Sequence, residues 1–536
     1  MAVLRSEVDP RSEQFARNRE AMAALLGEVR EHERRTREAS AKAKGVFDRR
    51  GQLLPRERVG RLLDPGSPWL ELSTLAGVGA GGRDASKGVG GAGVIVGIGY
   101  VAQTRCAVVA SDSGIDAGAI GSMGLEKILR AQEIALRNKL PFVYLVESAG
   151  ANLLQYRVET FVQGGAIFAN LARLSAAGLP VVSVVHGSST AGGAYLPGLS
   201  DYVVMVRGRA RAFLAGPPLL RAATGEIATE EDLGGAEMHA RVSGLAEYVA
   251  DDDADALRIA RDIVAKLAWG RVPAPAGPPP RYDVEELLGV MPADPKQPAD
   301  MREVVARVVD GSDFLEFKAD YGPATVTGHA AIEGMPVGIV TNNGPLDPDG
   351  AAKATHFIQA CCQSGIPIVY LQNTTGYIVG TQAERAGMIK HGAKMIQAVT
   401  TANVPQLTVM CGASFGAGNY GMCGRGFGPR FAFSWPNAQT AVMGPQQAAE
   451  TMAIVMEESV RRKGGTVDEK TLAALREQIF TTFARQMPAI VTSGLLLDDG
   501  VIDPRDTRRV LSFALSVCRE AEARAVRPVQ FGVARP

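Results

Sequence analysis

Two glycine-rich loops contain the residues of this sequence whose types and spacing suggest chemistry. The first, residues 187–198, directly follows an apolar, strand-like run and reads Gly-Ser-Ser-Thr-Ala-Gly-Gly-Ala-Tyr-Leu-Pro-Gly. Where a strand leads through small residues into a helix, the first N–H groups of the helix have no partner within it, and glycine lets a ligand approach them. The amides of Gly192 and Gly193 could therefore stabilise negative charge that develops on a carbonyl oxygen. We predict an oxyanion hole here.

The same arrangement recurs around Ala417 and Gly418. The segment Gly416-Ala417-Gly418-Asn419-Tyr420 matches Ala191-Gly192-Gly193-Ala194-Tyr195, and Tyr420 lies 225 residues after Tyr195. An isolated pair of glycines is most often an ordinary turn. A pair that returns at the same place in a repeat is less easily explained that way, and two such holes imply a reaction with two enolate-like species.

The loops belong to a longer internal repeat. Three further landmarks return in the same order at a nearly constant offset: Leu140–Leu145 as Ile366–Leu371, Leu179–Val182 as Val404–Leu407, and Ala215–Pro217 as Met443–Pro445. We therefore expect two copies of one fold.

Each copy is expected to alternate short buried strands with helices, which favours α/β architecture. In the first copy we expect strands at 94–98, 142–146 and 181–185, and a helix over 125–136 that turns Lys127 away from its apolar face. In the second copy we expect strands at 336–341, 368–372 and 406–411, and a helix over 352–363. Residues 10–60 read as one or two helices.

A proline-rich run marks the boundary between the copies. Between Trp269 and Arg281, proline stands at 273, 275, 278, 279 and 280, which resists helix and sheet and is typical of a semi-rigid linker. We predict an N-terminal domain over residues 1–272 and a C-terminal domain over 282–536, each long enough for its own core.

Composition argues against several classes of partner and site. Lys plus Arg and Asp plus Glu balance at 57 each, so charge gives no reason to expect nucleic acid or a membrane surface. No apolar run reaches the roughly 18 residues of a membrane span. The six Cys and six His show no CxxC or HExxH spacing, so we expect neither disulfides nor a metal. The N-terminus has no signal-peptide pattern, which predicts a cytoplasmic protein. No Walker A loop is present.

Beyond these features, the chain resembles the carboxyltransferase (β) subunits of biotin-dependent acyl-CoA carboxylases over nearly its full length. The stretch Gly418-Asn419-Tyr420-Gly421-Met422-Cys423-Gly424-Arg425 looks most like the branch that acts on 3-methylcrotonyl-CoA and geranyl-CoA. The other stretches that carry the resemblance are residues 53–58, 62–68, 190–195, 213–218, 233–236, 308–312 and 499–504.

The resemblance implies two tandem crotonase-like domains, each a ββα superhelix, in an enzyme that transfers the carboxyl group of carboxybiotin to an acyl-CoA. It also implies a hexamer within an α6β6 holoenzyme, with active sites between the N domain of one subunit and the C domain of another. The sequence has no Ala-Met-Lys-Met biotinylation motif, since Lys394-Met395 reads as helix. Biotin and the ATP- and bicarbonate-using biotin carboxylase are therefore expected on a separate α subunit.

By the same resemblance, acyl-CoA lies on the N-terminal domain, with its thioester oxygen facing the amides of Gly192 and Gly193. The residues expected to line the CoA side are Ser148, Ala149, Gly150, Ala151 and Ala191. Biotin lies on the C-terminal domain, with its ureido oxygen facing the amides near Ala417 and Gly418. The residues expected to border biotin are Thr374, Thr375, Gly376, Tyr377, Phe415 and Gly416. The segments 148–151 and 373–377 could equally be turns alone, and Phe415 and Tyr420 could equally be core residues. In this scheme biotin is the base, so no side-chain base is needed.

Two segments depart from the family pattern. Where the methylcrotonyl branch usually reads Thr-Val-Lys-Gly-Gly-Thr, residues 114–121 contain Asp116 and no lysine, and the family's Glu-Ala-Ala-Gln-Lys appears as residues 349–353. The first segment is expected near the acyl or CoA pocket. An acid there could reject a negatively charged group, and the small residues 117–119 could leave room for a longer acyl chain.

Several alternatives stay open at this point. The acyl group could be branched and α,β-unsaturated, or it could be acetyl, propionyl or a long chain. The same fold could also serve a biotin-dependent decarboxylase or transcarboxylase. A paralogue retained only as an assembly scaffold is the non-enzyme alternative, prompted by the altered segment 114–121, and the intact glycines at 192, 193 and 418 argue against it.

Overall fold

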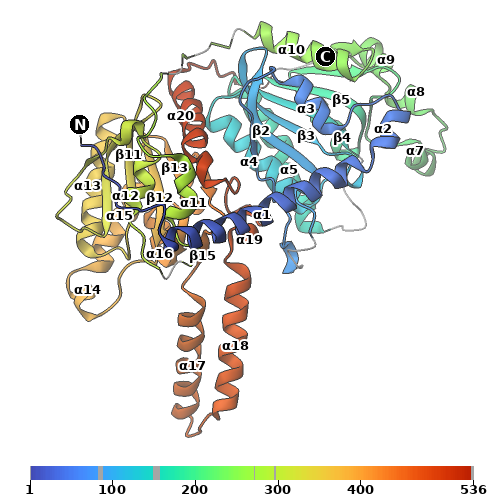
Figure 1. Cartoon of the computed structure of the whole chain (residues 1–536). Helices are drawn as coiled ribbons and strands as arrows, with labels where there is room; N and C mark the ends of the chain where they lie inside the picture. Colours follow the sequence, from blue (N-terminus) through green and yellow to red (C-terminus); the bar gives the residue numbers. More distant parts are fainter. Residues whose placement is uncertain are drawn as a thin grey trace. The chain divides into compact units, whose positions relative to one another are not determined.

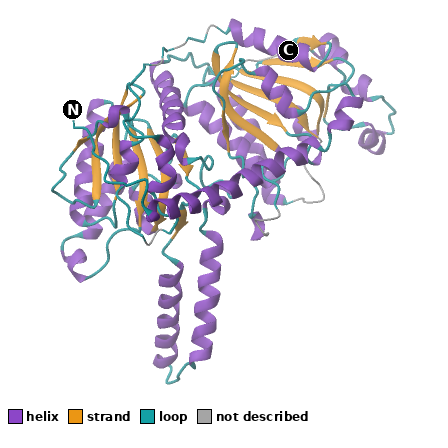
Figure 2. Ribbon diagram, in the orientation of Figure 1, coloured by secondary structure: helices purple, strands orange, loops and turns teal. Residues whose placement is uncertain are grey.

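The strands of the computed structural model form two mixed sheets, one in each half of the chain (Figures 1 and 2). The structure describes residues 2–82, 88–148, 157–267, 269–270, 272–273, 275–294, 297–530 and 532. This is the α/β architecture with two similar sheets that the internal repeat predicts.

The first sheet has the strand order β1-β2-β3-β4-β5-β6-β8, and β7 pairs with β5. The strands β1 to β3 are antiparallel and the remaining pairs are parallel. Their bounds are β1 Leu70–Leu72, β2 Val94–Val101, β3 Thr104–Ser111, β4 Phe142–Ser148, β5 Val181–Thr190, β6 Tyr202–Val206, β7 Arg211–Phe213 and β8 Tyr248–Ala250.

The second sheet has the order β14-β13-β12-β11-β10-β9, and β15 pairs with β13 as β7 pairs with β5. Its bounds are β9 Leu315–Glu316, β10 Thr325–Ile332, β11 Met335–Asn342, β12 Ile368–Thr374, β13 Gln406–Phe415, β14 Phe431–Ser434 and β15 Gln439–Ala441. The strands predicted at 94–98, 142–146, 181–185, 336–341, 368–372 and 406–411 are confirmed as β2, β4, β5, β11, β12 and β13.

The two sheets share an irregularity at the same place. The register between β4 and β5 shifts between Val146 and Ser148, and the register between β12 and β13 shifts between Gln372 and Thr374. Such a shift bends a strand and redirects its last side chains. The ends of β4 and β12 are therefore matched positions, as the repeat predicts.

Helices cover these largely buried strands. The helix predicted over 125–136 is α4 and the one over 352–363 is α13. Residues 10–60 form three helices rather than one or two. In the first half the helices are α1 Glu13–Ala41, α2 Lys44–Arg49, α3 Pro55–Leu62, α4 Ser122–Arg137, α5 Val158–Ala176, α6 Tyr195–Gly198, α7 Pro217–Thr224, α8 Glu230–Gly234, α9 Ala236–Met238 and α10 Asp253–Lys266. In the second half they are α11 Leu287–Val290, α12 Met301–Ala306, α13 Pro348–Ser364, α14 Thr381–Arg385, α15 Met388–Thr401, α16 Gly416–Gly421, α17 Pro445–Arg462, α18 Glu469–Gln486, α19 Ala489–Gly494 and α20 Thr507–Ala523.

One side-chain direction predicted for α4 is wrong. Lys127 is not turned away from the protein interior but is buried, and its Nζ donates to the carbonyl oxygens of Val94 at 2.7 Å and Gly91 at 3.3 Å. Burial lowers the pKa of this ammonium group to about 8. The long side chain reaches carbonyl groups at the start of β2, which compensate its burial.

By its internal contacts the chain divides into two compact units. One comprises Met1–Arg30, Gly79–Ala85 and Ala274–Ser516 and holds the second sheet. The other comprises Glu31–Val78, Ser86–Pro273 and Val517–Pro536 and holds the first sheet. The domain limits at residues 272 and 282, which come from the sequence repeat, stay a prediction.

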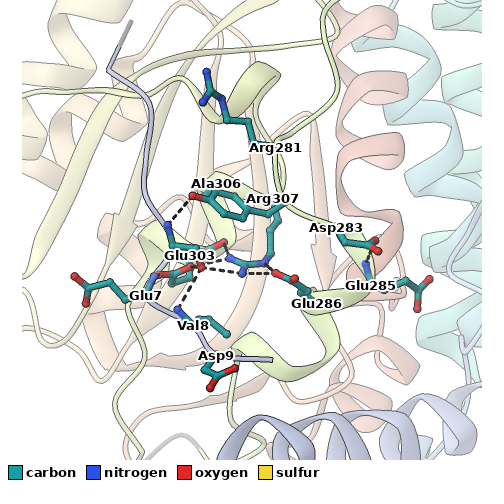
Figure 3. Close-up of polar contacts among 12 residues, drawn as sticks. Glu7, Val8, Asp9, Arg281, Asp283, Glu285, Glu286, Glu303, Ala306 and Arg307 are labelled. Carbon is teal, nitrogen blue, oxygen red and sulfur yellow. Dashed lines mark hydrogen bonds and ion pairs between the residues drawn. The ribbon is translucent and has the colours of Figure 1, made fainter. Parts of the chain in front are cut away.

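The N-terminal segment is tied to the unit of the second sheet through Arg307 (Figure 3). Arg307 donates to Glu286 and, at 2.7 Å, to Glu303. Glu303 in turn accepts from Ser6 Oγ at 2.6 Å and from the Glu7 backbone N–H at 2.7 Å. Because this arginine is fully buried, the two carboxylates also compensate its charge.

A long helical hairpin made of α17 and α18 extends from the same unit (Figure 1). Its two helices pack chiefly on each other. Met452, Ile454 and Val455 on α17 remain exposed. Among the residues that the structure describes, no helix combines the length and the apolar character needed to cross a bilayer.

Candidate active site

The first glycine-rich loop begins later than predicted. Residues 187–190 extend β5, because their small side chains let the backbone pair with β7. Ala191 then adopts a left-handed conformation, with φ +53°, and opens a short 3₁₀ turn over Ala191–Ala194. The Thr190 side chain makes no capping hydrogen bond to this turn. The amides of Gly192 and Gly193 thus lie in a first turn that no side chain of the preceding residue caps.

The second loop has the same construction. Strand β13 continues to Phe415, and Gly416 turns the chain into α16 with φ +54°. The Phe415 side chain makes no capping hydrogen bond. Ala417 and Gly418 therefore occupy the positions that Gly192 and Gly193 occupy in the first loop. The two loops match in backbone conformation as well as in sequence.

The glycines of the two loops differ in how much room surrounds them. A Cβ atom added to Gly192 would meet Phe168 Cζ at 3.6 Å, and one added to Gly193 would meet Ser189 Oγ at 3.6 Å, both ordinary contacts. A Cβ atom on Gly418 would lie 2.8 Å from Gly376 Cα. Packing therefore requires glycine at 418, whereas it does not require glycine at 192 or 193.

On the predicted CoA side, the structure brings Ser148 to the first loop. Ser148 pairs with Ser189 across β4 and β5, and its buried hydroxyl donates to the carbonyl oxygen of Gly118 at 2.8 Å. Ala191 is exposed at the start of the loop. The other predicted residues of this side, Ala149, Gly150 and Ala151, lie outside the described residues.

On the predicted biotin side, the end of β12 lies against the second loop. Thr374 pairs with Ser414, and Gly376, with φ +111°, would place a Cβ atom 3.3 Å from the carbonyl oxygen of Phe415. Thr375 is exposed between them. Thr374 and Gly376 are thus close to Gly416 and Gly418, as a shared site requires.

Two aromatic residues predicted on the biotin side point into the protein. The Phe415 side chain is buried among Ala413 and Met487, so only its backbone borders the loop. Tyr377 packs against Gly392 and Gly421, and burial raises the pKa of its hydroxyl. By contrast, Tyr420 is half-exposed. The Phe415 side chain thus packs in the core, and its role beside biotin stays a prediction.

A network of buried charged residues joins α3, β4, β5 and α10 and was missed by the sequence analysis. We call Arg58, Glu147, His186 and Asp253 the Arg58 network. The Arg58 guanidinium donates to Glu147 at 2.5 Å and to Asp253 at 3.1 Å. His186 Nδ1 lies 2.9 Å from Asp253. All four residues are at least nine-tenths buried.

The charges of this network are set by mutual contact. Burial and the nearby Arg58 lower the pKa of His186, so the imidazole is neutral and its Nδ1–H donates to Asp253. Burial alone would raise the pKa of Asp253, but His186 and Arg58 lower it to about 2. Burial likewise opposes ionisation of Glu147, and Arg58 nevertheless keeps its pKa below the usual value. The network thus holds one cation and two carboxylates.

A signal for this network was present in the sequence. Glu147 ends the apolar run of β4, and His186 stands in the apolar run of β5. A charged residue at the carboxyl end of a buried strand needs a partner or a function. The partner, Arg58, lies in the stretch 53–58 that carried the family resemblance.

The segment that departs from the family pattern lies directly on this region. Asp116, Ala117 and Gly118 are all left-handed, with φ between +47° and +72°. A Cβ atom on Gly118 would collide with the carbonyl oxygen of Glu147. The turn therefore packs closely on the end of β4, beside Ser148, while Asp116 and Ala117 are exposed.

Known proteins resemble this chain along nearly its whole length. The model of the carboxyl transferase domain family matches residues 48–530. The chain is 48% identical to the probable biotin-dependent acyl-coenzyme A carboxylase beta2 subunit of Mycobacterium tuberculosis, over 96% of this chain and 97% of that protein. The chain belongs to the carboxyltransferase β subunits of biotin-dependent acyl-CoA carboxylases. This membership implies a partner α subunit and an acyl-CoA substrate.

Two further comparisons place this β subunit within the family. It is 48% identical to the biotin-dependent 3-methylcrotonyl-coenzyme A carboxylase beta1 subunit of M. tuberculosis, over 88% of this chain and 89% of that one. It is 55% identical to the geranyl-CoA carboxylase β subunit of P. aeruginosa, whose crystal structure superposes with a TM-score of 0.93 over 99% of both chains. The β subunit is thus close to the methylcrotonyl-CoA and geranyl-CoA branch, as the sequence stretch at 418–425 indicates.

Proposed function

We propose that this β subunit carboxylates a branched, α,β-unsaturated acyl-CoA of the 3-methylcrotonyl or geranyl type. Support comes from its similarity to the subunits that act on these two compounds. Both acyl groups are 3-methyl-2-enoyl thioesters, so they share the reacting part of the molecule and differ in chain length. The common chemistry is removal of a proton to give a conjugated enolate, which then attacks carbon dioxide.

The observation that carries the proposal is the pair of matched, uncapped first turns. In the first loop, the amides of Gly192 and Gly193 would donate to the thioester oxygen and stabilise the enolate charge there. Removing one donor from such a pair typically raises the barrier by about 2.7–4 kcal/mol. Because packing does not require glycine at either position, the need for close approach by a ligand explains the glycines better than the fold does.

We assign the second loop to the ureido oxygen of biotin. The amides of Ala417 and Gly418 lie in an uncapped turn, and Gly376 presents only backbone beside them. Carboxybiotin supplies the carboxyl group and, once that group has left, a base. In this chain, Thr374, Thr375 and Gly376 would border the bound ring, and the loop amides would stabilise charge on its oxygen.

We also propose the assembly and setting in which the subunit works. Biotin and the ATP- and bicarbonate-using activity reside on the α subunit, and the β subunits form a hexamer within an α6β6 enzyme in the cytoplasm. The exposed apolar residues Met452, Ile454 and Val455 on α17 support self-association, because a solvated monomer would leave them uncovered.

ATP-dependent fixation of labelled bicarbonate tests the proposed function. The β subunit is co-expressed with its biotinylated α subunit and supplied with a panel of acyl-CoAs of different length, branching and saturation. We expect the highest kcat/KM with 3-methylcrotonyl-CoA or geranyl-CoA. Preference for acetyl-CoA or propionyl-CoA would refute the substrate class. Carboxyl exchange between acyl-CoAs without ATP would indicate a transcarboxylase, and no turnover with any acyl-CoA would indicate a scaffold.

A further inference from the structure

A buried acid stands where three segments of the acyl-CoA side meet. Glu147 accepts hydrogen bonds from Arg58 at 2.5 Å, from Ser113 Oγ at 2.8 Å and from Gln52 Nε2 at 3.1 Å. Ser113 begins the turn that continues through residues 114–118. The carboxylate therefore links helix α3 to that turn at the end of β4.

Glu147 also lies on the strand that leads to the first loop. A Cβ atom at Gly187 on β5 would be 2.5 Å from Glu147 Oε1, so the acid side chain crosses the backbone of β5 at close range. The next residue, Ser148, holds the same turn through its hydrogen bond to Gly118. The 113–118 turn is thus fastened to β4 at both of its ends.

The second copy of the fold has an uncharged residue at the position that matches Glu147. Asn373 occupies the position of Glu147 at the end of β12, and its Oδ1 would be 2.5 Å from a Cβ atom at Gly412. It accepts a hydrogen bond from the Ala413 backbone N–H at 3.3 Å. A neutral amide therefore fills this place in the fold.

Arg58 and His186 are also confined to the first copy. An arginine–glutamate pair common to both copies aligns them here: Arg56 binds Glu71, and Arg302 binds Glu316. With these pairs matched, Arg58 corresponds to Val304. His186, which lies 225 residues before Cys411, corresponds to that residue in β13. Arg58, Glu147 and His186 are thus replaced by Val304, Asn373 and Cys411 at the matched positions of the second copy.

We propose that Arg58 and Glu147 are positioning residues for acyl-CoA, which fix the 113–118 turn as part of the wall of the acyl-CoA site. Burying a charged pair is costly, and an apolar or neutral replacement is often equally stable. The second copy contains such a replacement, so stability alone does not account for the network. The proposal rests on the proposed function, because it takes the first loop to be the acyl-CoA side.

Variants that loosen the turn test this proposal. Ser113→Ala removes only the hydrogen bond between the turn and Glu147, and Glu147→Gln removes the charge at nearly constant shape. We expect both to raise KM and the calorimetric Kd for acyl-CoA roughly tenfold, since small misplacements near a site have large effects. We expect kcat to change less than twofold, and the ratio of kcat/KM for geranyl-CoA to that for 3-methylcrotonyl-CoA to shift.

Glu71→Gln is the matched control. It breaks the Arg56–Glu71 pair, which also joins α3 to the sheet but touches neither the turn nor Glu147. We expect a lower melting temperature with KM and Kd for acyl-CoA unchanged. Ser113 is only half-buried, so its replacement should disturb folding less. If Glu147→Gln fails to assemble, the result for Ser113→Ala therefore tests the proposal.

Two results would overturn the proposal. One is unchanged Kd and KM in Ser113→Ala and Glu147→Gln. The other is an equal loss in Glu71→Gln, which would indicate general destabilisation. Failure of the proposed function looks different, because the wild-type holoenzyme would then neither bind nor carboxylate a 3-methyl-2-enoyl-CoA.

Discussion

At the scale of single residues, Gly192 and Gly193 stand out because a Cβ atom at either position would make only ordinary contacts. Glycine at 418, in contrast, is required by the close approach of Gly376. The two loops therefore restrict glycine for different reasons. At 192 and 193 the approach of a ligand would favour glycine, whereas at 418 internal packing also requires it.

A side chain at 193 should therefore affect catalysis more than folding. We expect Gly193→Val to lower kcat for 3-methyl-2-enoyl-CoA by about 10²- to 10³-fold, the usual cost of losing an oxyanion donor. Assembly measured by light scattering should be unchanged. Gly198→Val, at a glycine with open space around it, is the control and should retain activity. Full activity in Gly193→Val would refute the oxyanion assignment.

Asp498 should give the protein a pH-dependent stability of unusual sign. It is fully buried, and burial raises its pKa to about 6. The folded state therefore binds a proton more tightly than the unfolded chain, so this residue lowers stability as pH rises from about 4 to about 6. Replacing it by Asn should remove this loss, on the order of 2–3 kcal/mol at pH 7.

Melting temperatures of wild type and Asp498→Asn between pH 4 and pH 8 check this expectation. The advantage of the variant should grow with pH. Asp468→Asn is the control of opposite sign, because hydrogen bonds from Thr471 lower the pKa of this exposed N-cap residue. That variant should be less stable than wild type by an amount that is already fully present near pH 4 and stays constant up to pH 8. A pH-independent difference for Asp498→Asn would contradict the assignment.

The sequence predicts the loop residues well and the Arg58 network poorly, for a physical reason. Gly192, Gly193 and Gly418 stand in a repeat, and their effect depends on local backbone alone. Arg58 and Glu147 are far apart in the sequence and become a pair only when α3 is placed against β4. No local sequence pattern predicts this packing of α3 against β4. A charged residue at the end of an apolar strand indicates only that some partner is needed.

At the scale of elements, the apolar runs predict the central strands because those strands are buried on both faces. The limits of the strands are less predictable. Strands β5 and β13 each continue through polar and glycine residues that read as loop, since pairing with β7 and β15 depends on strands that lie later in the chain. The helical periodicity of α4 predicts its apolar face but not the buried ammonium group of Lys127.

Lys127 and its twin in α13, Lys353, offer a test of what holds α4 to the sheet. Lys127 binds two carbonyl groups, whereas the Nζ of buried Lys353 finds no hydrogen-bond partner among the described residues. We expect Lys127→Met to destabilise the protein by about 1.5–3 kcal/mol, the value of hydrogen bonds to a charged group. Lys353→Met should be nearly neutral or stabilising. Thermal unfolding of both variants measures the difference, and equal losses would contradict it.

At the scale of the whole molecule, the internal repeat predicts two copies of one fold, and the two sheets confirm it. The division of the chain into compact units is harder to predict from the sequence. Residues Met1–Arg30 belong with the second sheet and Val517–Pro536 with the first. An amphipathic helix indicates that one face is covered, but not by which part of the chain, so the sequence assigns each terminus to its nearer half.

Removal of the N-terminal segment should therefore lower the stability of the unit that holds the second sheet, although most of that unit is far away in the sequence. Deleting residues 2–8 takes away the Ser6 and Glu7 donors of Glu303, and we expect a drop in the melting temperature of the unit that holds the second sheet. A peptide of residues 2–30 added in trans should restore part of it. Arg11→Ala changes an exposed residue that pairs with the nearby Asp9 and is the control. An unchanged melting temperature after the deletion would contradict this account.

The short edge strands of the two sheets affect how readily the folded protein aggregates at high concentration. The central strands β5 and β13 are each ten residues long, whereas the edge strands β1, β8, β9 and β14 have three, three, two and four residues. Such short edges leave little open backbone on which another chain could add a strand. Aggregation should thus be a hazard mainly of chains that have not finished folding, when long apolar strands still stand unpaired.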